Sequence, residues 1–487
     1  MDYDTIIGLE VHAQLLTKSK MFCRCSADYI DAAPNTHVCQ VCLGMPGVLP
    51  VINQQALEYA VMTALALKCT IPEYTKFDRK NYPYPDLMKG YQISQYDAPL
   101  GIGGWIDIEI EEREKRIGIT RVHLEEDTAK LTHCTTPEGE TYSLVDVNRS
   151  GVALLEIVGE PNLRSAEEAR QYLVKLRTIL QFLSVSSGNM EEGSFRCDAN
   201  ISLRPTGSTD SVKVEVKNMN SFKAVYRALE YEEKRQRKAI EEGERLVQET
   251  RGWIEERGIT VSQRSKEYAH DYRYFPEPDL PPLVFSRQWV EELRSHIPEL
   301  PDAMRDRFMA KYDLSRYDAS LITASKAIAG YFEDCVKLNK EAPIEKRAKA
   351  VTNWLLGDFT RLLHLADIDI EEARGKVTPK HLMEMLDLID QGKLSGAAAK
   401  TVFEEMFDSG RRASDIVAER GLTQISDARE IEGIVDRVIA NNEQAVSDFK
   451  KGKEQALTFL VGHVMRETKG RANPSLVNKL LKERLKN

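Results

Sequence analysis

Ile7–Leu15 reads IGLEVHAQL, and its residues alternate between two chemical types. Its odd-numbered residues are apolar, whereas Glu10, His12 and Gln14 are polar. A period of two is typical of a β-strand, in which successive side chains point to opposite faces of a sheet. The stretch therefore predicts a strand with one face in a core and the other carrying an acid and a histidine.

Three further segments share this alternation: Ile117–Glu126, Phe195–Leu203 and Val212–Val216. Their polar faces carry, in that order, Arg121, His123 and Glu125, then Arg196, Asp198 and Asn200, then Lys213, Glu215 and Lys217. An antiparallel sheet with one face in water explains any single face of this kind. Several strands rich in Glu, Asp, Asn, His and Arg instead indicate a site, and nearby loops add Glu126, Asp127, Glu191 and Glu192.

This mixture of side chains suits phosphoryl transfer from ATP. Mg²⁺ binds carboxylate and water oxygens and is shared with nucleotide phosphates, while arginine stabilises charge on a transferring phosphoryl group. His12 fits Mg²⁺ less well, and it could orient a water or phosphate or bind a transition metal instead. The sequence has no G-x-x-x-x-G-K-[ST] loop and no G-x-G-x-x-G before a helix, so ATP would be held through a carboxylate-bound metal on the sheet.

Cys23, Cys25, Cys39 and Cys42 form a C-x-C-x13-C-x2-C pattern. Four thiolates in two close pairs are the usual ligands of a tetrahedral structural Zn²⁺, which leaves no open position for catalysis. The alternative is four unrelated buried thiols.

Composition and charge narrow the class of protein. A length of 487 residues predicts about three domains, and 42% hydrophobic with 29% charged residues is typical of a soluble globular chain. The net charge of −9 excludes a uniformly basic nucleic-acid-binding protein. We find neither a secretory signal nor an apolar run near the ~18 residues of a membrane helix, and eight cysteines are too few for a disulfide scaffold. We therefore expect a cytoplasmic protein.

The chain changes character along its length. Strand-like alternation dominates residues 1–290, interrupted by a helix that starts at Ser165, with Glu168 as its capping-box partner, and by a helix over Phe222–Glu244 whose charged end we expect to be solvated. A proline-rich stop at Pro276–Pro282 precedes helical patterns over 295–400 and 402–487. The end is basic, with ten Lys or Arg against three Glu from Phe449 to Asn487. That segment is either a solvated helical face or a set of contacts to nucleic-acid phosphates.

Nine motifs in their order along the chain resemble the GatB family, the B subunits of the aspartyl/glutamyl-tRNA amidotransferases. They are GLEVHAQL (8–15), VCLGMPGVLP (41–50), KNYPYPDLMKGYQISQ (80–95), HLEEDTAK (123–130), DVNRSGVALLEI (146–157), MEEGSFRCDANISLRP (190–205), KNMNSFKA (217–224), DYRYFPEPDLPP (271–282) and GRANPSLVNKLL (470–481). The resemblance covers essentially the whole chain.

The resemblance implies an α+β protein with a catalytic cradle domain on an antiparallel sheet at 1–290, a helical domain at 295–400 and a small all-α, tRNA-binding tail domain at 402–487. It implies a heterotrimer in which an amidase, the A subunit, releases ammonia from glutamine. The third chain would be a small C subunit. This chain would phosphorylate the side-chain carboxylate of Glu-tRNA(Gln) or Asp-tRNA(Asn) with ATP and Mg²⁺, and ammonia would then displace phosphate.

The resemblance also assigns roles to residues of this sequence. The metal and ATP site would be Glu10, His12 and Glu125, joined by Glu126, Glu191, Glu192, Arg196, Asp198 and Asn200. The ammonia path would enter at Lys80, Tyr82, Asp86, Lys89 and Gln92. Zinc would bind Cys23, Cys25, Cys39 and Cys42, and tRNA phosphates would contact Lys450, Lys451, Lys453, Arg466, Lys469 and Arg471.

Two other functions remain open at this point. One is a non-catalytic tRNA-binding scaffold with a structural zinc. In such a scaffold the acidic face of the sheet would contribute only to packing. The other is a free-standing ligase that joins a small-molecule carboxylate to an amine.

Overall fold

The computed structural model describes residues 3–111, 113–208, 211–265, 272–338, 343–422, 428–450, 453–468 and 471–486. These residues form two compact units, Met1–Leu300 and Pro301–Asn487. Over the described ranges, no helix is both long and apolar enough to cross a lipid bilayer.

An eight-stranded sheet forms the centre of the first unit. Its strands are, in order across the sheet, β13 (Ile259–Ser265), β12 (Glu249–Ile254), β11 (Val214–Lys217), β10 (Phe195–Pro205), β1 (Tyr3–Gln14), β9 (Ala153–Gly159), β6 (Arg113–Glu126) and β5 (Gly101–Ile110). Neighbouring strands are antiparallel except β11 and β12, which are parallel. With the helical second unit, this sheet confirms the predicted α+β class.

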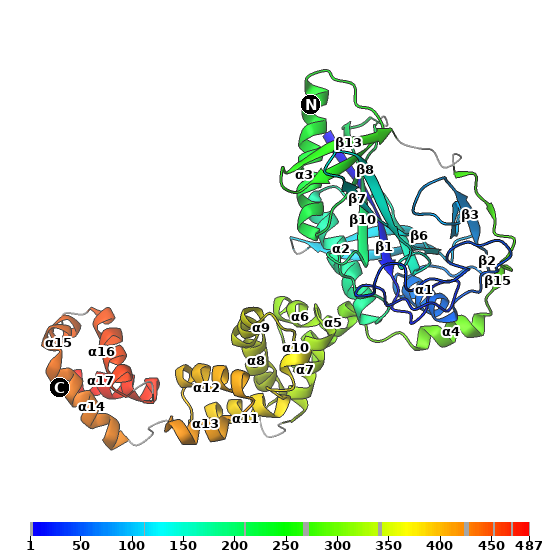
Figure 1. The fold of residues 1–487 in the computed structure, drawn as a ribbon. Helices are drawn as coiled ribbons and strands as arrows, with labels where there is room; N and C mark the ends of the chain where they lie inside the picture. Colours follow the sequence, from blue (N-terminus) through cyan, green and yellow to red (C-terminus); the bar gives the residue numbers. More distant parts are fainter. Residues whose placement is uncertain are drawn as a thin grey trace. The chain divides into compact units, whose positions relative to one another are not determined.

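Helices cover the apolar face of the sheet. They are α1 (Gln54–Ala66), α2 (Ala166–Phe182) and α3 (Phe222–Glu241), and Figure 1 shows α2 and α3 on one side of the sheet with β3 on the other. The predicted face of β1 is buried from Ile7 to Ala13 at every second residue, as a half-buried strand requires. α2 begins where predicted, because the Ser165 side chain accepts a hydrogen bond from the Glu168 backbone N–H.

The charged end of α3 differs from the sequence prediction. Glu232 and Gln236 are fully buried instead of solvated, and the Glu232 carboxylate pairs with Arg235 and accepts a hydrogen bond from Thr260 Oγ1 at 2.9 Å. Thr260 lies on β13, so the carboxylate ties the helix to the edge of the sheet. The pattern misled because a buried ion-paired acid and an exposed one have the same sequence signature.

Two glycines of β5 let α1 approach the sheet closely. A Cβ at Gly104 would lie 2.3 Å from the Leu67 carbonyl oxygen, and one at Gly101 would lie 2.8 Å from Ala64 Cβ. Side chains at either position would push the end of α1 away. These glycines therefore allow the end of α1 to pack closely against β5.

Shorter strands border the polar face. β14 (Phe275–Pro276), β3 (Asp78–Asn81) and β4 (Tyr91–Ser94) form one small sheet, and β2 (Tyr74–Thr75) pairs with β15 (Leu283–Val284) ahead of α4 (Arg287–Ser295). The first small sheet is joined to β6, because Gln92 Nε2 donates to the Glu126 carbonyl and Leu124 N–H donates to Gln95 Oε1. β7 (Lys130–Thr135) and β8 (Thr141–Asp146) form a separate hairpin.

The second unit is helical and has two separate cores. The first contains α5 (Pro301–Tyr312), α6 (Arg316–Thr323), α7 (Lys326–Leu338), α8 (Ile344–Trp354), the π-helical turn Leu355–Phe359, α9 (Thr360–Ala366), α10 (Ile370–Ala373), α11 (Pro379–Asp390), α12 (Gly396–Ser409) and α13 (Ala413–Arg420). The other contains α14 (Ala428–Asn441), α15 (Glu443–Lys450), α16 (Glu454–Glu467) and α17 (Pro474–Lys486).

The two cores bear on the expected domain boundaries. The expected division between residues 400 and 402 falls inside α12, whose Val402, Phe403 and Met406 are buried in the first helical core. The next core begins at Ile431. We therefore propose that the tail domain starts after Leu422, while the first domain extends to about the unit boundary at Leu300.

Candidate active site

The registers of four strands bring one row of polar side chains together. On β1, His12 lies opposite Arg196 of β10 on one side and opposite Glu156 of β9 on the other. Glu156 in turn lies opposite His123 of β6. Directly opposite residues project from the same face of an antiparallel sheet, so the four side chains line up across it.

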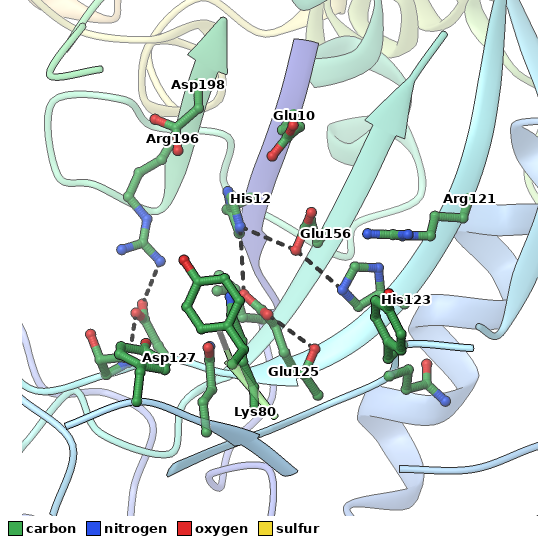
Figure 2. Close-up of a pocket in the computed structure, with 18 of the residues that line it drawn as sticks. Glu10, His12, Lys80, Arg121, His123, Glu125, Asp127, Glu156, Arg196 and Asp198 are labelled. Carbon is green, nitrogen blue, oxygen red and sulfur yellow. Dashed lines mark hydrogen bonds and ion pairs between the residues drawn. The ribbon is translucent and has the colours of Figure 1, made fainter. Parts of the chain in front are cut away.

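Glu125 joins this row from β6 and completes a group of possible metal ligands (Figure 2). His12 Nε2 lies 3.5 Å from a Glu125 oxygen and 3.4 Å from a Glu156 oxygen, and the three ligand atoms all lie within 4.8 Å of one another. Ser94 Oγ donates to the other Glu125 oxygen at 3.3 Å. Two carboxylates and one imidazole in such a cluster suit a divalent cation, although Mg²⁺ itself prefers oxygen.

The electrostatics of this cluster favour a positive charge at its centre. Burial lowers the pKa of His12, but Glu156 and Glu125 outweigh burial and raise it to about 9, with Arg196 opposing them. Burial raises the pKa of Glu156, but His123 and His12 lower it well below its usual value. A metal cation bound between the same two carboxylates would balance their charge in place of the proton on His12.

A cavity of about 560 Å³ opens above these residues. Its walls add five cationic side chains: Lys80, Arg121, Arg196, Lys213 and Lys217. They also add the tyrosines Tyr82, Tyr272 and Tyr274. Acidic groups at the floor and cationic groups on the walls can bind a metal together with an anionic substrate.

Among the five cavity cations, Lys80 is the one that lies over aromatic rings of the described residues. Its Nζ lies 5.0 Å from the ring centroid of Tyr272 and 5.7 Å from that of Tyr82. Burial lowers the pKa of Lys80, but Glu125 and the neighbouring tyrosines raise it above its usual value. Lys80 therefore presents a fixed positive charge to the cavity.

Arg196 reaches the cavity from the other side and pairs with Asp127. Its Nη2 lies 2.9 Å from Asp127 Oδ2. Burial lowers the pKa of Arg196, while Asp127, Glu125 and Asp198 raise it. Asp127 is 2% exposed, and although burial raises its pKa, Arg196 and Arg149 lower it.

Most of the expected catalytic residues line this cavity. They are Glu10, His12, Glu125, Arg196 and Asp198, with Lys80, Tyr82 and Gln92 from the expected ammonia path. Asn200 supports Glu10, because its Nδ2 donates to Glu10 Oε1 at 2.8 Å.

Glu126, the residue after Glu125 on β6, does not line this cavity. Its carboxylate binds Lys89 and accepts a hydrogen bond from the Ile93 backbone N–H at 2.9 Å. Glu191 and Glu192 lie on the loop before β10, outside the residues that line the cavity, and Asp86 also lies outside them.

Several cavity residues were absent from the predicted site. Glu156 is the most important of them. It is the one charged residue of the strand-like run Ala153–Gly159, and this pattern could have identified it as a site residue. His123, Arg121 and Lys217 were predicted on polar faces but were given no role. Tyr272 and Tyr274 also line the cavity, and they belong to the motif at 271–282, to which the sequence assigned no role in the site.

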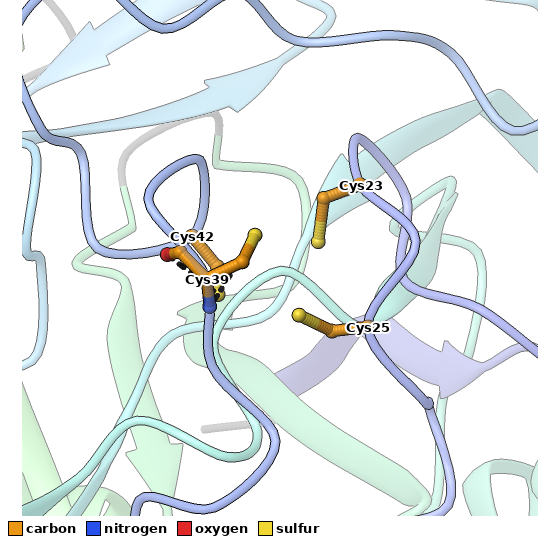
Figure 3. A group of neighbouring side chains, drawn as sticks. All are labelled: Cys23, Cys25, Cys39 and Cys42. Carbon is orange, nitrogen blue, oxygen red and sulfur yellow. Dashed lines mark hydrogen bonds between the residues drawn. The ribbon is translucent and has the colours of Figure 1, made fainter.

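The four cysteines lie together in the loops after β1 (Figure 3). Their sulfurs lie within 4.8 Å of one another, and Cys39 Sγ lies 3.9 Å from Cys42 Sγ. Tetrahedral zinc–thiolate bonds of ~2.3 Å place neighbouring sulfurs about 3.8 Å apart. The cluster could therefore bind a metal ion, and its geometry suits Zn²⁺.

Four of the basic tail residues fall in described parts of the chain. Lys450 ends α15, Lys453 pairs with Asp448 at 3.1 Å, Arg466 lies on α16, and Arg471 donates to the Thr468 carbonyl at 3.3 Å. Lys451 and Lys469 lie outside the described residues.

Comparison with known proteins gives matches over most of the chain. Residues 5–291 match the family described as the GatB/GatE catalytic domain, and residues 330–485 match the GatB domain. The chain is 57% identical over 486 residues to a Dehalococcoides mccartyi protein named as the B subunit of an aspartyl/glutamyl-tRNA(Asn/Gln) amidotransferase, with 99% of each chain covered. Proteins of the same name from Caldanaerobacter subterraneus subsp. tengcongensis and Moorella thermoacetica are each 56% identical over 486 residues, with both chains fully covered.

Proposed function

Because this chain belongs to the GatB family, we propose that it is the component of a tRNA-dependent amidotransferase that activates and amidates misacylated tRNA. Its substrates are Glu-tRNA(Gln), Asp-tRNA(Asn) or both, as the name of its relatives suggests. The observation that carries this proposal is the cavity in which His12, Glu125 and Glu156 meet beneath cationic walls. We place the reaction in the cytoplasm, where aminoacyl-tRNA is made and used.

The reaction needs two steps because a carboxylate is a poor acyl donor. In the first, a side-chain carboxylate oxygen attacks the γ-phosphorus of ATP and ADP leaves, which forms an acyl phosphate. In the second, ammonia attacks the acyl carbon, loses a proton, and the C–O bond to phosphate breaks. One amide, one ADP and one inorganic phosphate result, and the phosphate keeps one oxygen of the original carboxylate.

The cavity residues divide this chemistry between them. His12, Glu125 and Glu156 would hold Mg²⁺ with support from Glu10, and bound Mg²⁺ supplies charge neutralisation between the two reacting anions. Arg196 and Lys80 face the cavity and stabilise negative charge on the phosphoryl oxygens. Asp198 orients Lys217, which lies 2.6 Å from its carboxylate.

Ammonia has to reach the acyl phosphate before water does. We propose that it enters along Lys80, Tyr82, Asp86, Lys89 and Gln92, from an amidase (the A subunit) that is held in a heterotrimer with a small C subunit. The Lys89–Glu126 pair and the hydrogen bond from Gln92 to the Glu126 carbonyl support this proposal, because they fix the segment against the end of β6.

The remaining predicted sites serve structure and RNA binding. Zn²⁺ in the cysteine cluster would close the loops after β1, with no open position for chemistry. Glu191 and Glu192 would act from the loop before β10 if that loop folds toward bound substrate. The basic tail residues would contact tRNA phosphates, which are recognised by charge and shape.

The test is conversion of labelled Glu-tRNA(Gln) by this chain copurified with its amidase partners. ATP, Mg²⁺ and ammonium chloride are supplied, so that the amidase step is bypassed, and Asp-tRNA(Asn) is tried in parallel. The proposal predicts amide formation that requires ATP. If tRNA binds but neither substrate is amidated, the chain is a scaffold. If ATP is consumed without tRNA in the presence of a small carboxylic acid, it is a free-standing ligase.

A further inference from the structure

Asp127 is a buried carboxylate that the proposed chemistry does not use. It lies just after β6, and its backbone is fixed, since its N–H donates to the Val152 carbonyl at 2.8 Å and its carbonyl accepts from Gly151 N–H at 2.9 Å. Gln14 Nε2 donates to Asp127 Oδ2 at 2.8 Å, and Gln14 is itself hydrogen-bonded to the Tyr29 hydroxyl. The carboxylate therefore has one fixed position at the edge of the cavity.

Two guanidinium groups face this carboxylate. Arg196 Nη2 lies 2.9 Å from Oδ2, and Arg149 Nε lies 3.7 Å from Oδ1. Arg149 is anchored elsewhere, because it donates to the carbonyls of Thr128 and Ala129, each at 2.9 Å. Arg196 is the one of the two that lines the cavity.

Arg196 stands between two sets of acids. Asp127 holds it on one side, while Glu125 and Asp198 attract its charge from the cavity side. The Arg196 side chain is 35% exposed and lines the cavity, so its guanidinium can be reached by a ligand. Figure 2 shows the side chain turned toward Asp127, with the metal-ligand cluster beside it.

We propose that Asp127 is a positioning residue that holds Arg196 away from Glu125, so that this carboxylate stays open to a cation and the remaining guanidinium N–H groups stay open to an anionic oxygen. The inference rests on the proposed function, because it takes His12, Glu125 and Glu156 as the metal site.

The physical reason is competition between two cations for one carboxylate. A guanidinium forms strong charge-assisted hydrogen bonds with any carboxylate it can reach. Without a negative charge at position 127, Arg196 is attracted only by the acids of the cavity. Arg196 would then pair with Glu125, which the metal needs as a ligand. A nearby opposite charge lowers the pKa of a carboxyl group by about one to three units, which shows how strongly the two groups attract each other.

The test measures binding of Mn²⁺, a spectroscopic substitute for Mg²⁺, to the full-length chain with its cysteine cluster loaded with zinc. Free Mn²⁺ is followed by electron paramagnetic resonance, which requires neither tRNA nor turnover. Asp127→Asn is expected to weaken Mn²⁺ binding about tenfold or more. The double variant Asp127→Asn/Arg196→Gln is expected to restore binding to at least the wild-type level, because the competing cation is gone.

Two controls keep the inference falsifiable. Arg196→Gln alone leaves Asp127 in place and is expected to bind Mn²⁺ at least as tightly as the wild type. Asp107→Asn makes the same substitution in an ion pair on β5, outside the residues that line the cavity, and is expected to change nothing. Unchanged binding in Asp127→Asn would overturn the inference. The inference would also be overturned if the double variant kept a wild-type circular dichroism spectrum but still bound Mn²⁺ weakly. Weakened Mn²⁺ binding in Arg196→Gln alone would overturn it as well.

A kinetic measurement separates this inference from the proposed function. In the amidation assay, excess Mg²⁺ is expected to recover the rate of Asp127→Asn but not that of Arg196→Gln. If the wild type does not amidate tRNA while the Mn²⁺ pattern holds, the proposed function fails and the positioning role stands. If amidation occurs and the Mn²⁺ pattern is absent, the positioning role fails alone.

Discussion

Glu125 interacts with several of the groups that line the cavity. One of its oxygens lies 3.5 Å from His12, the other accepts from Ser94, and its charge acts on Lys80 and Arg196. Glu125→Gln keeps the size of the side chain and its contact with Ser94 but removes the negative charge. We expect the rate of ammonium-driven amidation to fall by at least about a hundredfold, with tRNA affinity unchanged.

Glu138→Gln is the matched control for that substitution. Glu138 is exposed in the turn between β7 and β8, outside the residues that line the cavity, so its loss of charge should leave the rate unchanged. A Glu125→Gln protein with more than about half of the wild-type rate would remove Glu125 from the mechanism.

The cysteine cluster gives a second prediction at the scale of single residues. Cys42 is the most buried of the four, so Cys42→Ser should lower bound zinc below one ion per chain and lower the melting temperature by about 5 °C or more. Cys134 lies on β7, apart from the cluster, and Cys134→Ser should change neither quantity. Full zinc occupancy in Cys42→Ser, by plasma emission spectroscopy, would argue against this ligand set.

At the scale of elements, Glu232 decides how α3 is held. Its carboxylate has no exposed surface and binds Arg235, Arg251 and Thr260. Removing one partner of a buried ion pair leaves the other charges uncompensated, so Glu232→Ala should lower the free energy of unfolding by about 3–5 kcal/mol.

Glu233, the next residue, offers the control for that prediction. It forms a surface ion pair with Arg237 at 3.3 Å, and Glu233→Ala should cost less than about 1 kcal/mol. Urea unfolding of the two variants compares them directly. Equal losses of stability would mean that the buried network contributes no more than a surface pair.

The sequence predicted elements better than it predicted their partners. Alternation assigned the faces of β1, β6 and β10, and the Ser165 cap assigned the start of α2, because both signals are local. Glu156 was missed because its role depends on which strands are neighbours, and β9 lies between β1 and β6 only in the folded sheet. Tyr272 and Tyr274 reach the cavity through the pairing of β14 with β3, a contact across about two hundred residues that no local pattern encodes.

Over the whole molecule, basic residues are concentrated at the C-terminal end of a sequence whose net charge is −9. The described tail carries Lys450, Lys453, Arg466 and Arg471. Replacing these four by Gln should weaken tRNA binding and lower the slope of log affinity against log salt by as much as about three, because fewer phosphates are neutralised.

A control variant changes the net charge by the same amount but in the first unit of the chain. Lys234, Lys238, Arg245 and Arg257 are exposed residues of the first unit that do not line the cavity, and their replacement by Gln should leave the salt slope close to wild type. Filter binding over a salt series measures both variants. Equal slopes in the tail variant and the wild type would show that the tail does not bind the tRNA backbone.

We propose that this cavity transfers a phosphoryl group to the side-chain carboxylate of an aminoacyl-tRNA. The most direct measurement uses Glu-tRNA(Gln) with oxygen-18 in both side-chain carboxylate oxygens, together with ATP, Mg²⁺ and ammonium. Mass spectrometry then determines the label in the inorganic phosphate released. We expect one labelled oxygen in each phosphate that accompanies an amide, and no such phosphate with Glu125→Gln. Amide formation with unlabelled phosphate would contradict it.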